Sequence, residues 1–457
     1  MQNYTSYYFL GIGGIGMSAL ARYFHAKSFK VAGYDRTSTV LTKEMEKEGI
    51  AIHYSDDIML IPADFRDPET CFVVITPAIP TTHKEWGYFQ YHDFEIMKRA
   101  QVLGKITEMG CGLCIAGTHG KTTTSTMTAH LLNASHVGCN AFLGGVSKNF
   151  DTNLLLSDKT NLVVIEADEY DRSFHQLKPF MAVITAADAD HLDIYGTKEA
   201  FRDSFEHFTS LIREGGCLIM RKGISVTPKL KEAVKLFTYS ASEGGDFHAE
   251  NIRVEKGEII FDFVTPTAII FNLKLGVPVL INVENAVAAM ALAWLNDVTD
   301  EELRAGIASF KGIRRRFDFH VKSDKISYLD DYAHHPTELT QSIKSIKALF
   351  PDKKVCGIFQ PHLYTRTRDF APEFSEALSM LDELILLDIY PARELPIEGV
   401  TSQLVFDKVT IKDKTLCTKE ELMAELPKHN FDVLVTLGAG DIDKFIPEIT
   451  KYCEGLI

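Results

Sequence analysis

The stretch 113–133 constrains the fold more than any other part of the chain. It reads L-C-I-A-G-T-H-G-K-T-T-T-S-T-M-T-A-H-L-L-N. The apolar run Leu113–Ala116 predicts a buried strand, and the segment that begins at Lys121 predicts a helix, with a glycine-rich turn between them. Backbone N–H groups at the start of a helix point at an anion, and the helix dipole favours negative charge there. The stretch therefore predicts a strand, a loop and a helix that hold nucleotide phosphates.

Seven consecutive residues of this turn are candidates for ATP binding: Gly117, Thr118, His119, Gly120, Lys121, Thr122 and Thr123. Lys121 would place a positive charge on the outer phosphates, and the Thr122 hydroxyl would bind Mg²⁺. The strict P-loop pattern G-x-x-x-x-G-K-[ST] requires glycine at position 115, where this chain has Ile115. The loop is therefore shorter than in that pattern. The alternative interpretation is a turn that carries a surface lysine.

A second glycine-rich turn, G-I-G-G-I-G at 11–16, lies near the N-terminus. It follows a predicted strand, Tyr7–Leu10, and precedes a predicted helix, Met17–Lys27, and a strand, Lys30–Tyr34. The pattern fits a dinucleotide, but the glycines require only that a pyrophosphate approaches the backbone, so a UDP-sugar fits as well. Candidates for this ligand come from the turn, from the ribose-binding position after the second strand and from the loop after a further strand, Phe72–Thr76: Gly11, Gly13, Gly14, Ile15, Gly16, Asp35, Thr76 and Ala78.

Acidic residues and a histidine follow two later strands. The predicted strand Leu162–Ile165 leads to Glu166, and the strand Met181–Ala186 leads to D-A-D-H-L-D at 188–193, which contains His191. A carboxylate at the tip of the strand beside a phosphate loop is where a Mg²⁺ ligand is expected, and His191 would be a second metal ligand. The alternatives are exposed loop acids and a structural histidine.

The chain has 457 residues, which predicts about three domains. A net charge of −14 argues against nucleic acid as a partner but not against a polyanionic ligand bound by local loops. The N-terminal residues lack the basic start of a signal peptide, and no apolar run reaches membrane-spanning length. The eight cysteines are scattered, and we interpret them as reduced and mostly structural. Together, the N-terminal residues, the lengths of the apolar runs and the scattered cysteines predict a cytoplasmic protein without membrane insertion.

The remaining chain continues the α/β alternation. Predicted strands around 253–275 are antiparallel and lie at one edge of the central domain, because Lys256-Gly257 is a hairpin signal. The apolar helix Ala286–Leu295 follows Asn285. The basic segment 312–318 looks like a domain linker, and its three arginines either form a solvated cluster or supply one arginine to a nucleotide. After residue 326, polar and glycine residues again gather behind apolar strands, the ligand edge of a doubly wound sheet.

Three classes of function are open at this point. An ATP-driven ligase would use both glycine-rich turns and the polar third domain. A nicotinamide-dependent oxidoreductase would use G-x-G-x-x-G but leave Gly-Lys-Thr-Thr unexplained. A nucleotide-gated binding protein would leave the histidines and arginines of the third domain unexplained.

The whole chain resembles the Mur ligases of peptidoglycan synthesis, and within them the alanine-adding members. The resemblance rests on nine segments in this order: G-I-G-G-I-G-M, G-T-H-G-K-T-T-T, E-A-D-E, D-H-L-D, N-x-x-N-A, R-R-F-D, D-D-Y-A-H-H-P-T-E, F-Q-P-H-x-Y-T-R-T and L-G-A-G-D. It implies a three-domain α/β fold: a Rossmann-like UDP-substrate domain (1–107), a central P-loop-type ATPase domain with a mostly parallel sheet and antiparallel edge strands (108–313), and a Rossmann-like C-terminal domain for ATP and the amino acid (314–457).

The resemblance also implies a reaction. The lactyl carboxylate of UDP-N-acetylmuramate attacks the γ-phosphate of ATP, and the amine of L-alanine then attacks the acyl phosphate. Mg²⁺ is implied, with Mn²⁺ as an alternative, and the protein is expected to be a monomer or a weak homodimer. By the family pattern Thr122 and Glu166 hold one Mg²⁺ and His191 a second. Three further residues match positions that bind ATP: Asn285, Arg316 and, near the ribose, Asp331. Four others match the region that handles the amino acid and the acyl phosphate: Tyr332, His334, His362 and Arg366. Together with Lys121 and His191, these four are the expected catalytic residues.

Three positions depart from the family pattern. Phe205 stands where ligases for later amino acids carry a carbamoylated lysine, so no carbamate is expected. Leu363 replaces an arginine found in many alanine-adding members, so Arg366 or Arg393 would carry more of the carboxylate binding, and Ile281-Asn282 stands where many have Asn-His. The strongest rival lies within the family: a recycling ligase that adds a ready-made murein tripeptide to the same UDP-sugar. The segment 171–179 favours the alanine-adding pattern.

Overall fold

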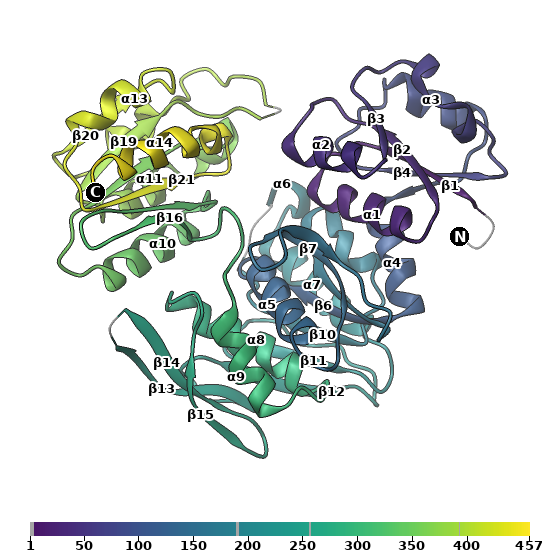
Figure 1. The fold of residues 1–457 in the computed structure, drawn as a ribbon, viewed down its shortest axis with the longest axis horizontal. Coiled ribbons are helices and arrows are strands. Elements are labelled where there is room, and N and C mark those ends of the chain that lie inside the picture. Colours follow the sequence, from purple (N-terminus) through teal and green to yellow (C-terminus); the bar gives the residue numbers. More distant parts are fainter. Residues whose placement is uncertain (1–3, 189–191, 256, 393) are drawn as a thin grey trace. The chain divides into compact units, whose positions relative to one another are not determined.

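The computed structural model describes residues 4–188, 192–255, 257–392 and 394–457. The chain divides into two compact units, which are described separately. The first contains Met1–Ile252, Ile260–Leu275 and Glu284–Phe310, and the second contains Arg253–Ile259, Gly276–Val283 and Lys311–Ile457. The described residues form three sheets with helices between the strands (Figure 1), which confirms the predicted α/β class.

The first sheet is parallel and has the order β3-β2-β1-β4-β5. Its strands are β1 (Ser6–Leu10), β2 (Lys30–Tyr34), β3 (Ala51–His53), β4 (Cys71–Ile75) and β5 (Ile96–Lys98), and its helices are α1 (Ile15–Ala26), α2 (Val40–Lys47), α3 (Lys84–Tyr91) and α4 (Arg99–Met109). Side chains alternate between the faces of β1, so Tyr7 stacks on Phe24 of α1 while Tyr8 contacts Phe89 of α3. The predicted strand–turn–helix–strand unit around residues 11–16 is confirmed.

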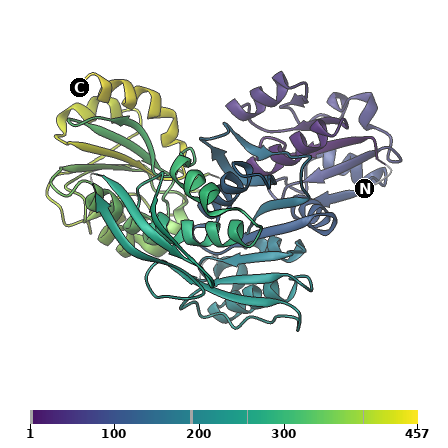
Figure 2. The same cartoon turned by 60° about the horizontal axis from the view of Figure 1, so that its bottom comes forward.

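The second sheet has ten strands in the order β15-β14-β13-β12-β11-β10-β6-β9-β7-β8 (Figure 2). Its strands are β6 (Cys111–Ala116), β7 (Asn140–Ser147), β8 (Thr152–Leu155), β9 (Leu162–Ala167), β10 (Met181–Ile184), β11 (Cys217–Arg221), β12 (Lys235–Ser240), β13 (Phe247–Glu255), β14 (Glu258–Val264) and β15 (Ile269–Lys274). The centre is parallel, and β14 pairs antiparallel with β15 at the predicted edge. The opposite edge is also antiparallel, because β8 returns beside β7; the sequence did not predict this pair.

The helices of this region are α5 (Lys121–Asn133), α6 (Leu192–Tyr195), α7 (Lys198–Ser210), α8 (Ile281–Trp294) and α9 (Asp300–Ser309), with a 3₁₀ segment at Tyr170–Gln176. Phe205 of α7 is fully buried, and its ring meets those of Phe174 and Phe201. A hydrophobic contact therefore occupies the position where some family members carry the carbamoylated lysine.

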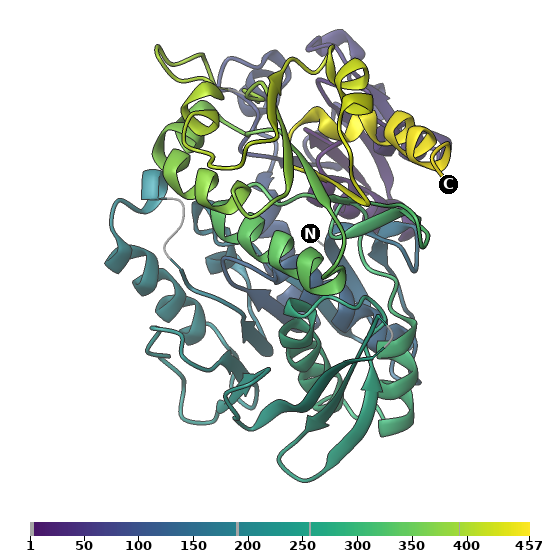
Figure 3. The ribbon, with the colours of Figure 1, turned by 90° about the vertical axis from the view of Figure 1, so that its left-hand side faces the viewer.

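The third sheet has the order β16-β17-β21-β18-β19-β20 (Figure 3). Its strands are β16 (Asp318–Lys322), β17 (Ser327–Asp331), β18 (Val355–Phe359), β19 (Glu383–Leu387), β20 (Lys414–Cys417) and β21 (Val433–Leu437), and its helices are α10 (Pro336–Leu349), α11 (Tyr364–Leu378), α12 (Gln403–Phe406), α13 (Leu422–Glu425) and α14 (Ile446–Glu454). Phe359 packs on Phe374 of α11, whereas Ile358 joins the core cluster that contains Ile449 of α14, so helices cover both faces. Strand β16 is antiparallel to β17, which the sequence did not predict.

Several strand ends differ from the sequence interpretation. Strands β4 and β10 end at Ile75 and Ile184, earlier than the predicted Thr76 and Ala186. Two other strands extend further than predicted. Glu166 was placed in the loop after its strand, but β9 continues to Ala167, with Glu166 opposite Ile115 of β6. Likewise the sequence predicts a strand over Ile326–Leu329, but β17 continues to Asp331, opposite Leu437 of β21. The backbone pairing continues because each neighbouring strand is long enough to extend the ladder, and charge on a side chain does not end a ladder. Among the described residues, no helix combines the length and apolar character needed to cross a bilayer.

Candidate active site

The loop between β6 and α5 depends on two glycines. Gly117 has φ +141°, and a Cβ atom there would lie 2.0 Å from Thr185 Oγ1. Gly120 has φ +80° and precedes α5, and a Cβ atom there would lie 2.7 Å from Asn285 Oδ1. Both positions therefore require glycine for backbone conformation and for space. Asn285, an expected ATP residue, lies against this loop and accepts a hydrogen bond from Thr124 Oγ1 at 3.2 Å.

Thr185, directly after β10, fixes the same loop. Its hydroxyl donates to the carbonyl oxygens of His119 and Ala116, and Thr118 N donates to Ala186 O at 3.2 Å. The sequence interpretation did not identify Thr185, because its role comes from a contact 66 residues away along the chain. Ile115 is a fully buried strand residue, which explains why the loop begins later than in the strict P-loop pattern.

Lys121 is surrounded by acidic groups. Its Nζ atom lies 2.9 Å from Glu169 Oε1 and donates to Gly117 O at 2.6 Å. Burial alone would lower the pKa of Lys121, but the carboxylates of Glu169, Asp168 and Glu166 together raise it above its ordinary value. The ammonium group is therefore charged, as a phosphate-binding lysine must be.

The loop also presents groups that suit phosphate and magnesium. The Thr118 hydroxyl is buried and has no hydrogen-bond partner among the described residues, so a phosphate oxygen would satisfy it. The Thr122 side chain lies at the start of α5 and is buried, and Glu166, the last residue but one of β9, lies beside Gly144 of β7. A hydroxyl and a carboxylate are hard oxygen donors of the kind that Mg²⁺ prefers, so these residues fit the expected ion. His191, the expected second ligand, lies outside the described residues.

The N-terminal glycine turn is held by Asp35. Its Oδ2 atom accepts a hydrogen bond from Gly13 N at 2.7 Å, and Oδ1 accepts one from Thr37 N at 3.0 Å. A Cβ atom at Gly11 would lie 2.4 Å from Thr76 Cγ2, so the turn also lies against the strand end at Thr76. Gly14, Ile15 and Ala78 are exposed and Gly13 and Gly16 are half-buried, so this side of the turn is open to a ligand. The ribose role of Asp35 stays a prediction.

Arg99 links the two glycine-rich regions within the first unit. Its NH2 atom lies 3.6 Å from Asp168 Oδ2, and a Cβ atom at Gly16 would lie 2.3 Å from its NH1 atom. Asn153 of β8 adds a second link, because its Nδ2 donates to Ile15 O at 2.6 Å. The start of α1 is thus tied to the loop after β9. The sequence interpretation missed Arg99 and Asn153, since neither lies in a recognisable phosphate or metal motif.

In the second unit, Arg315 and Arg316 flank the ring of Tyr332, each with its guanidinium carbon 5.0 Å from the ring centroid. Arg315 donates to Gly438 O at 2.8 Å and lies 3.4 Å from Asp330, so it joins β17 to the loop after β21. Arg316, the expected ATP residue, lies 3.8 Å from Glu338. Asp331 is buried at the end of the same strand as Asp330.

The expected amino-acid residues gather at one end of the third sheet. His334 Nδ1 lies 3.0 Å from Tyr332 O and 3.2 Å from Glu338 Oε2. Burial raises the pKa of Glu338, but His334 and Arg316 outweigh burial and hold it well below its ordinary value. The ring centroids of His334 and His362 are 6.0 Å apart. Arg366 is half-buried in the first turn of α11, which begins two residues after His362 in the chain.

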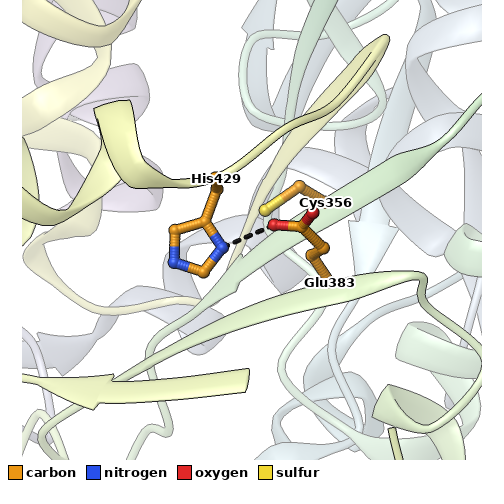
Figure 4. A group of neighbouring side chains, drawn as sticks. All are labelled: Cys356, Glu383 and His429. Atoms are coloured by element: carbon orange, nitrogen blue, oxygen red, sulfur yellow. Dashed lines mark hydrogen bonds and ion pairs between the residues drawn. The ribbon is translucent and has the colours of Figure 1, made fainter. Parts of the chain in front are cut away.

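A separate cluster lies at the amino ends of the strands of this sheet (Figure 4). The ligand-type atoms of Cys356, Glu383 and His429 lie within 4.8 Å of one another. His429 Nδ1 is 2.6 Å from Glu383 Oε2, and Lys354 forms an ion pair with Glu383 Oε1. Burial strongly raises the pKa of the Cys356 thiol. We interpret this cluster as a structural ion-pair network, because Glu383 already has two cationic or hydrogen-bonding partners.

Three family models match successive parts of the chain: the Mur ligase family catalytic domain at residues 6–109, the Mur ligase middle domain at 115–293 and the Mur ligase glutamate ligase domain at 315–440. UDP-N-acetylmuramate–L-alanine ligase of Phocaeicola vulgatus is 62% identical over 97% of both chains. The same enzyme of Parabacteroides distasonis is 61% identical over 98% of this chain and 97% of its own.

Solved structures agree in fold. A UDP-N-acetylmuramate–alanine ligase from Thermotoga maritima superposes with a TM-score of 0.81 at 26% identity, covering 98% of this chain and 99% of its own. A murein peptide ligase from Psychrobacter arcticus gives a TM-score of 0.71 at 22% identity, covering 99% of each chain, and shares the fold alone. With matches along nearly its whole length, the chain belongs to the Mur ligase family.

Proposed function

We propose that this chain is a UDP-N-acetylmuramate–L-alanine ligase, which joins L-alanine to the lactyl carboxylate of UDP-N-acetylmuramate with conversion of ATP to ADP and phosphate. The observation that carries this proposal is 62% identity over 97% of both chains to an enzyme of that name. The reaction supplies a precursor of peptidoglycan.

The chemistry explains why ATP is needed. An amine does not displace oxide from a carboxylate, because oxide is a very poor leaving group. Attack of the lactyl carboxylate on the γ-phosphorus releases ADP and forms an acyl phosphate. The alanine amine then attacks the acyl carbon, and the tetrahedral intermediate expels phosphate. The first attack brings two anions together, and the second places negative charge on the tetrahedral oxygen and the departing phosphate, so the protein must supply positive charge and hydrogen-bond donors there.

The first unit contains the groups for this task. We assign Gly117, Thr118, His119, Gly120, Lys121, Thr122 and Thr123 to the ATP phosphates, where the N–H groups at the start of α5 and the ammonium group of Lys121 bind anions. Asn285 belongs to the same group, because it already lies against Gly120. Thr122, Glu166 and His191 would hold Mg²⁺ or Mn²⁺, which when bound neutralises charge on the phosphates.

The N-terminal glycine turn is assigned to the UDP part of the sugar nucleotide. The residues are Gly11, Gly13, Gly14, Ile15, Gly16, Asp35, Thr76 and Ala78. Two observations support this assignment. Glycines allow a pyrophosphate to come close to the backbone, and the hydrogen bond from Gly13 N to Asp35 fixes the main chain of the turn. We also propose that residues 1–107 form the UDP-substrate domain, residues 108–313 the ATP domain and residues 314–457 the amino-acid domain.

In the second unit, Arg316 and Asp331 are assigned to ATP, and Tyr332, His334, His362 and Arg366 to L-alanine and the acyl phosphate. The support is their gathering at the carboxyl ends of β17 and β18, the ligand edge of such a sheet. His334 is held by Glu338, which keeps the imidazole in one orientation. Arg393, named as a further carboxylate contact, lies outside the described residues.

One assay tests the proposal. Purified protein is mixed with ATP, Mg²⁺ and UDP-N-acetylmuramate, and phosphate release is followed after adding L-alanine or the murein tripeptide. Release with L-alanine is the expected result. Release only with tripeptide would establish the recycling ligase, and no release together with a nicotinamide absorbance change would return the chain to the oxidoreductases. We further propose a cytoplasmic monomer or weak homodimer, which light scattering across protein concentrations tests.

A further inference from the structure

A buried carboxylate holds the ammonium group of the phosphate loop. Lys121 Nζ lies 2.9 Å from Glu169 Oε1 and 2.8 Å from Oε2. The Glu169 side chain is 2% exposed and that of Lys121 is 14% exposed. The pair is therefore a nearly buried salt bridge at the point where the ATP phosphates would arrive. Breaking such a pair without a replacement leaves an uncompensated charge and is strongly unfavourable.

The acidic residues of the segment E-A-D-E have different partners. Glu166, an expected metal ligand, lies beside Gly144 near the end of β9. Asp168 lies 3.6 Å from Arg99 and accepts a hydrogen bond from Tyr170 N at 3.1 Å. Glu169 is the acid that contacts Lys121 directly. Glu169 therefore contacts the lysine of the phosphate loop, whereas Glu166 lies beside Gly144 and Asp168 pairs with Arg99.

The backbone around Glu169 is also fixed. Tyr195 OH donates to Glu169 O at 2.6 Å, and the guanidinium carbon of Arg172 lies 4.8 Å from the centroid of the Tyr195 ring. Asp171 and Arg172 both have φ above +50°, a conformation that is unfavourable for residues other than glycine. Strain of this kind persists only where surrounding contacts hold it. The Glu169 carboxylate is therefore presented to Lys121 from a defined backbone.

We propose that Glu169 is a positioning residue for Lys121, which holds the ammonium group over the phosphate loop and competes with the terminal phosphate of ATP for it. The inference rests on the proposed function, in which Lys121 binds ATP. Before nucleotide binds, Glu169 keeps the lysine in its productive location, which removes a reorganisation step from binding. When the terminal phosphate binds, it must take over part of this ion pair, so the free energy of the pair opposes nucleotide affinity.

The test is calorimetric binding of the non-hydrolysable ATP analogue AMP-PNP with Mg²⁺. Glu169→Gln keeps the size and removes the competing charge, so the analogue should bind about three- to tenfold more tightly than to the wild type. In a Lys121→Met background there is no ammonium group to compete for, so adding Glu169→Gln should change affinity by less than about twofold. The matched control is Glu206→Gln, which removes a glutamate that pairs with Lys229 at 3.2 Å outside the phosphate loop.

Unchanged or weaker binding in Glu169→Gln overturns the inference, as does an equal change in the Lys121→Met background. If Glu169→Gln does not fold, Glu169→Asp withdraws the carboxylate by one methylene group, and tighter binding again is expected. Steady-state kinetics add a readout that a purely structural role would not move: KM for ATP should fall while KM for UDP-N-acetylmuramate is unchanged. Failure of the proposed function is distinguishable, because then the wild type itself releases no phosphate with L-alanine.

Discussion

A Cβ atom on Gly144 would lie 2.1 Å from Glu166 Oε2, so the glycine in β7 makes room for the carboxylate of Glu166, which lies near the end of β9. The two strands are parallel neighbours, with Phe142 opposite Ile165 in the register. Any side chain at Gly144 must therefore displace the carboxylate of Glu166. Since Glu166 is an expected magnesium ligand, this contact connects a backbone position to metal binding.

Gly144→Ala should raise the Mg²⁺ concentration needed for half-maximal activity by about tenfold, because the added methyl group moves the carboxylate away from its position. The measurement is a Mg²⁺ titration of phosphate release at saturating substrates. Gly87→Ala in α3 is the control, since a Cβ atom there meets nothing within 4 Å. A normal Mg²⁺ titration for Gly144→Ala would remove Glu166 from the metal site.

Lys121→Ala should lower the turnover number by about a hundred- to thousandfold, because the phosphates lose their nearest positive charge. Binding of UDP-N-acetylmuramate should persist, since the N-terminal turn is a separate set of residues. Phosphate release and calorimetric binding of the UDP-sugar measure the two effects. Lys105→Ala, which removes an exposed lysine of α4, controls for the loss of charge. Normal turnover in Lys121→Ala would contradict the phosphate-loop assignment.

Gly13→Ala should weaken binding of UDP-N-acetylmuramate by about tenfold, or 1.4 kcal/mol. A Cβ atom at Gly13 would lie 2.8 Å from Asp35 Oδ2, so the hydrogen bond from Gly13 N to that oxygen would have to shift and the turn with it. Separate titrations with UDP-N-acetylmuramate and with AMP-PNP distinguish the two ligands. An equal loss of affinity for both would argue against two separate sites.

Local sequence patterns predicted the elements that depend on local chemistry. The strand Lys30–Tyr34 was predicted with its observed bounds, and both glycine-rich turns precede helices as expected. Such patterns work because glycine conformation and apolar runs are properties of a few consecutive residues. The family segments extended the prediction to residues such as Asn285, which lies against Gly120 across 165 positions of sequence.

Contacts between distant segments were not predictable in this way. Thr185 and Arg99 each act on another strand or loop, and nothing in their own surroundings in the sequence distinguishes them. Glu169 belongs to the segment E-A-D-E, but its contact with Lys121 depends on the fold and could not be predicted from that segment. The antiparallel strands β8 and β16 were missed because a short edge strand has too few residues to show a periodic pattern. The strand ends at Glu166 and Asp331 were misplaced because ladder length is set by the neighbouring strand.

The N-terminal region also contains a buried acid whose titration affects stability. Glu85 is fully buried at the start of α3, and Tyr8 OH donates to its Oε2 atom at 2.7 Å. His53 Nε2 lies 2.8 Å from Tyr8 OH and 3.4 Å from Glu85 Oε1. Burial raises the pKa of Glu85 from 4.5 to about 7, against the opposing effect of the Tyr8 hydrogen bond. Burial lowers the pKa of His53.

The sign of the effect follows from linkage. A carboxyl group with a higher pKa in the folded state binds its proton more tightly there, so the free energy of unfolding falls as pH rises from 4.5 to about 7. Glu85→Gln removes this titration and keeps an acceptor for Tyr8. The variant should therefore gain stability relative to the wild type on going from pH 5.5 to pH 8, by up to about 2 kcal/mol. Urea unfolding of both proteins at the two pH values measures this, and the His53 titration is common to both. An equal stability difference at both pH values would show that Glu85 does not titrate as its burial requires.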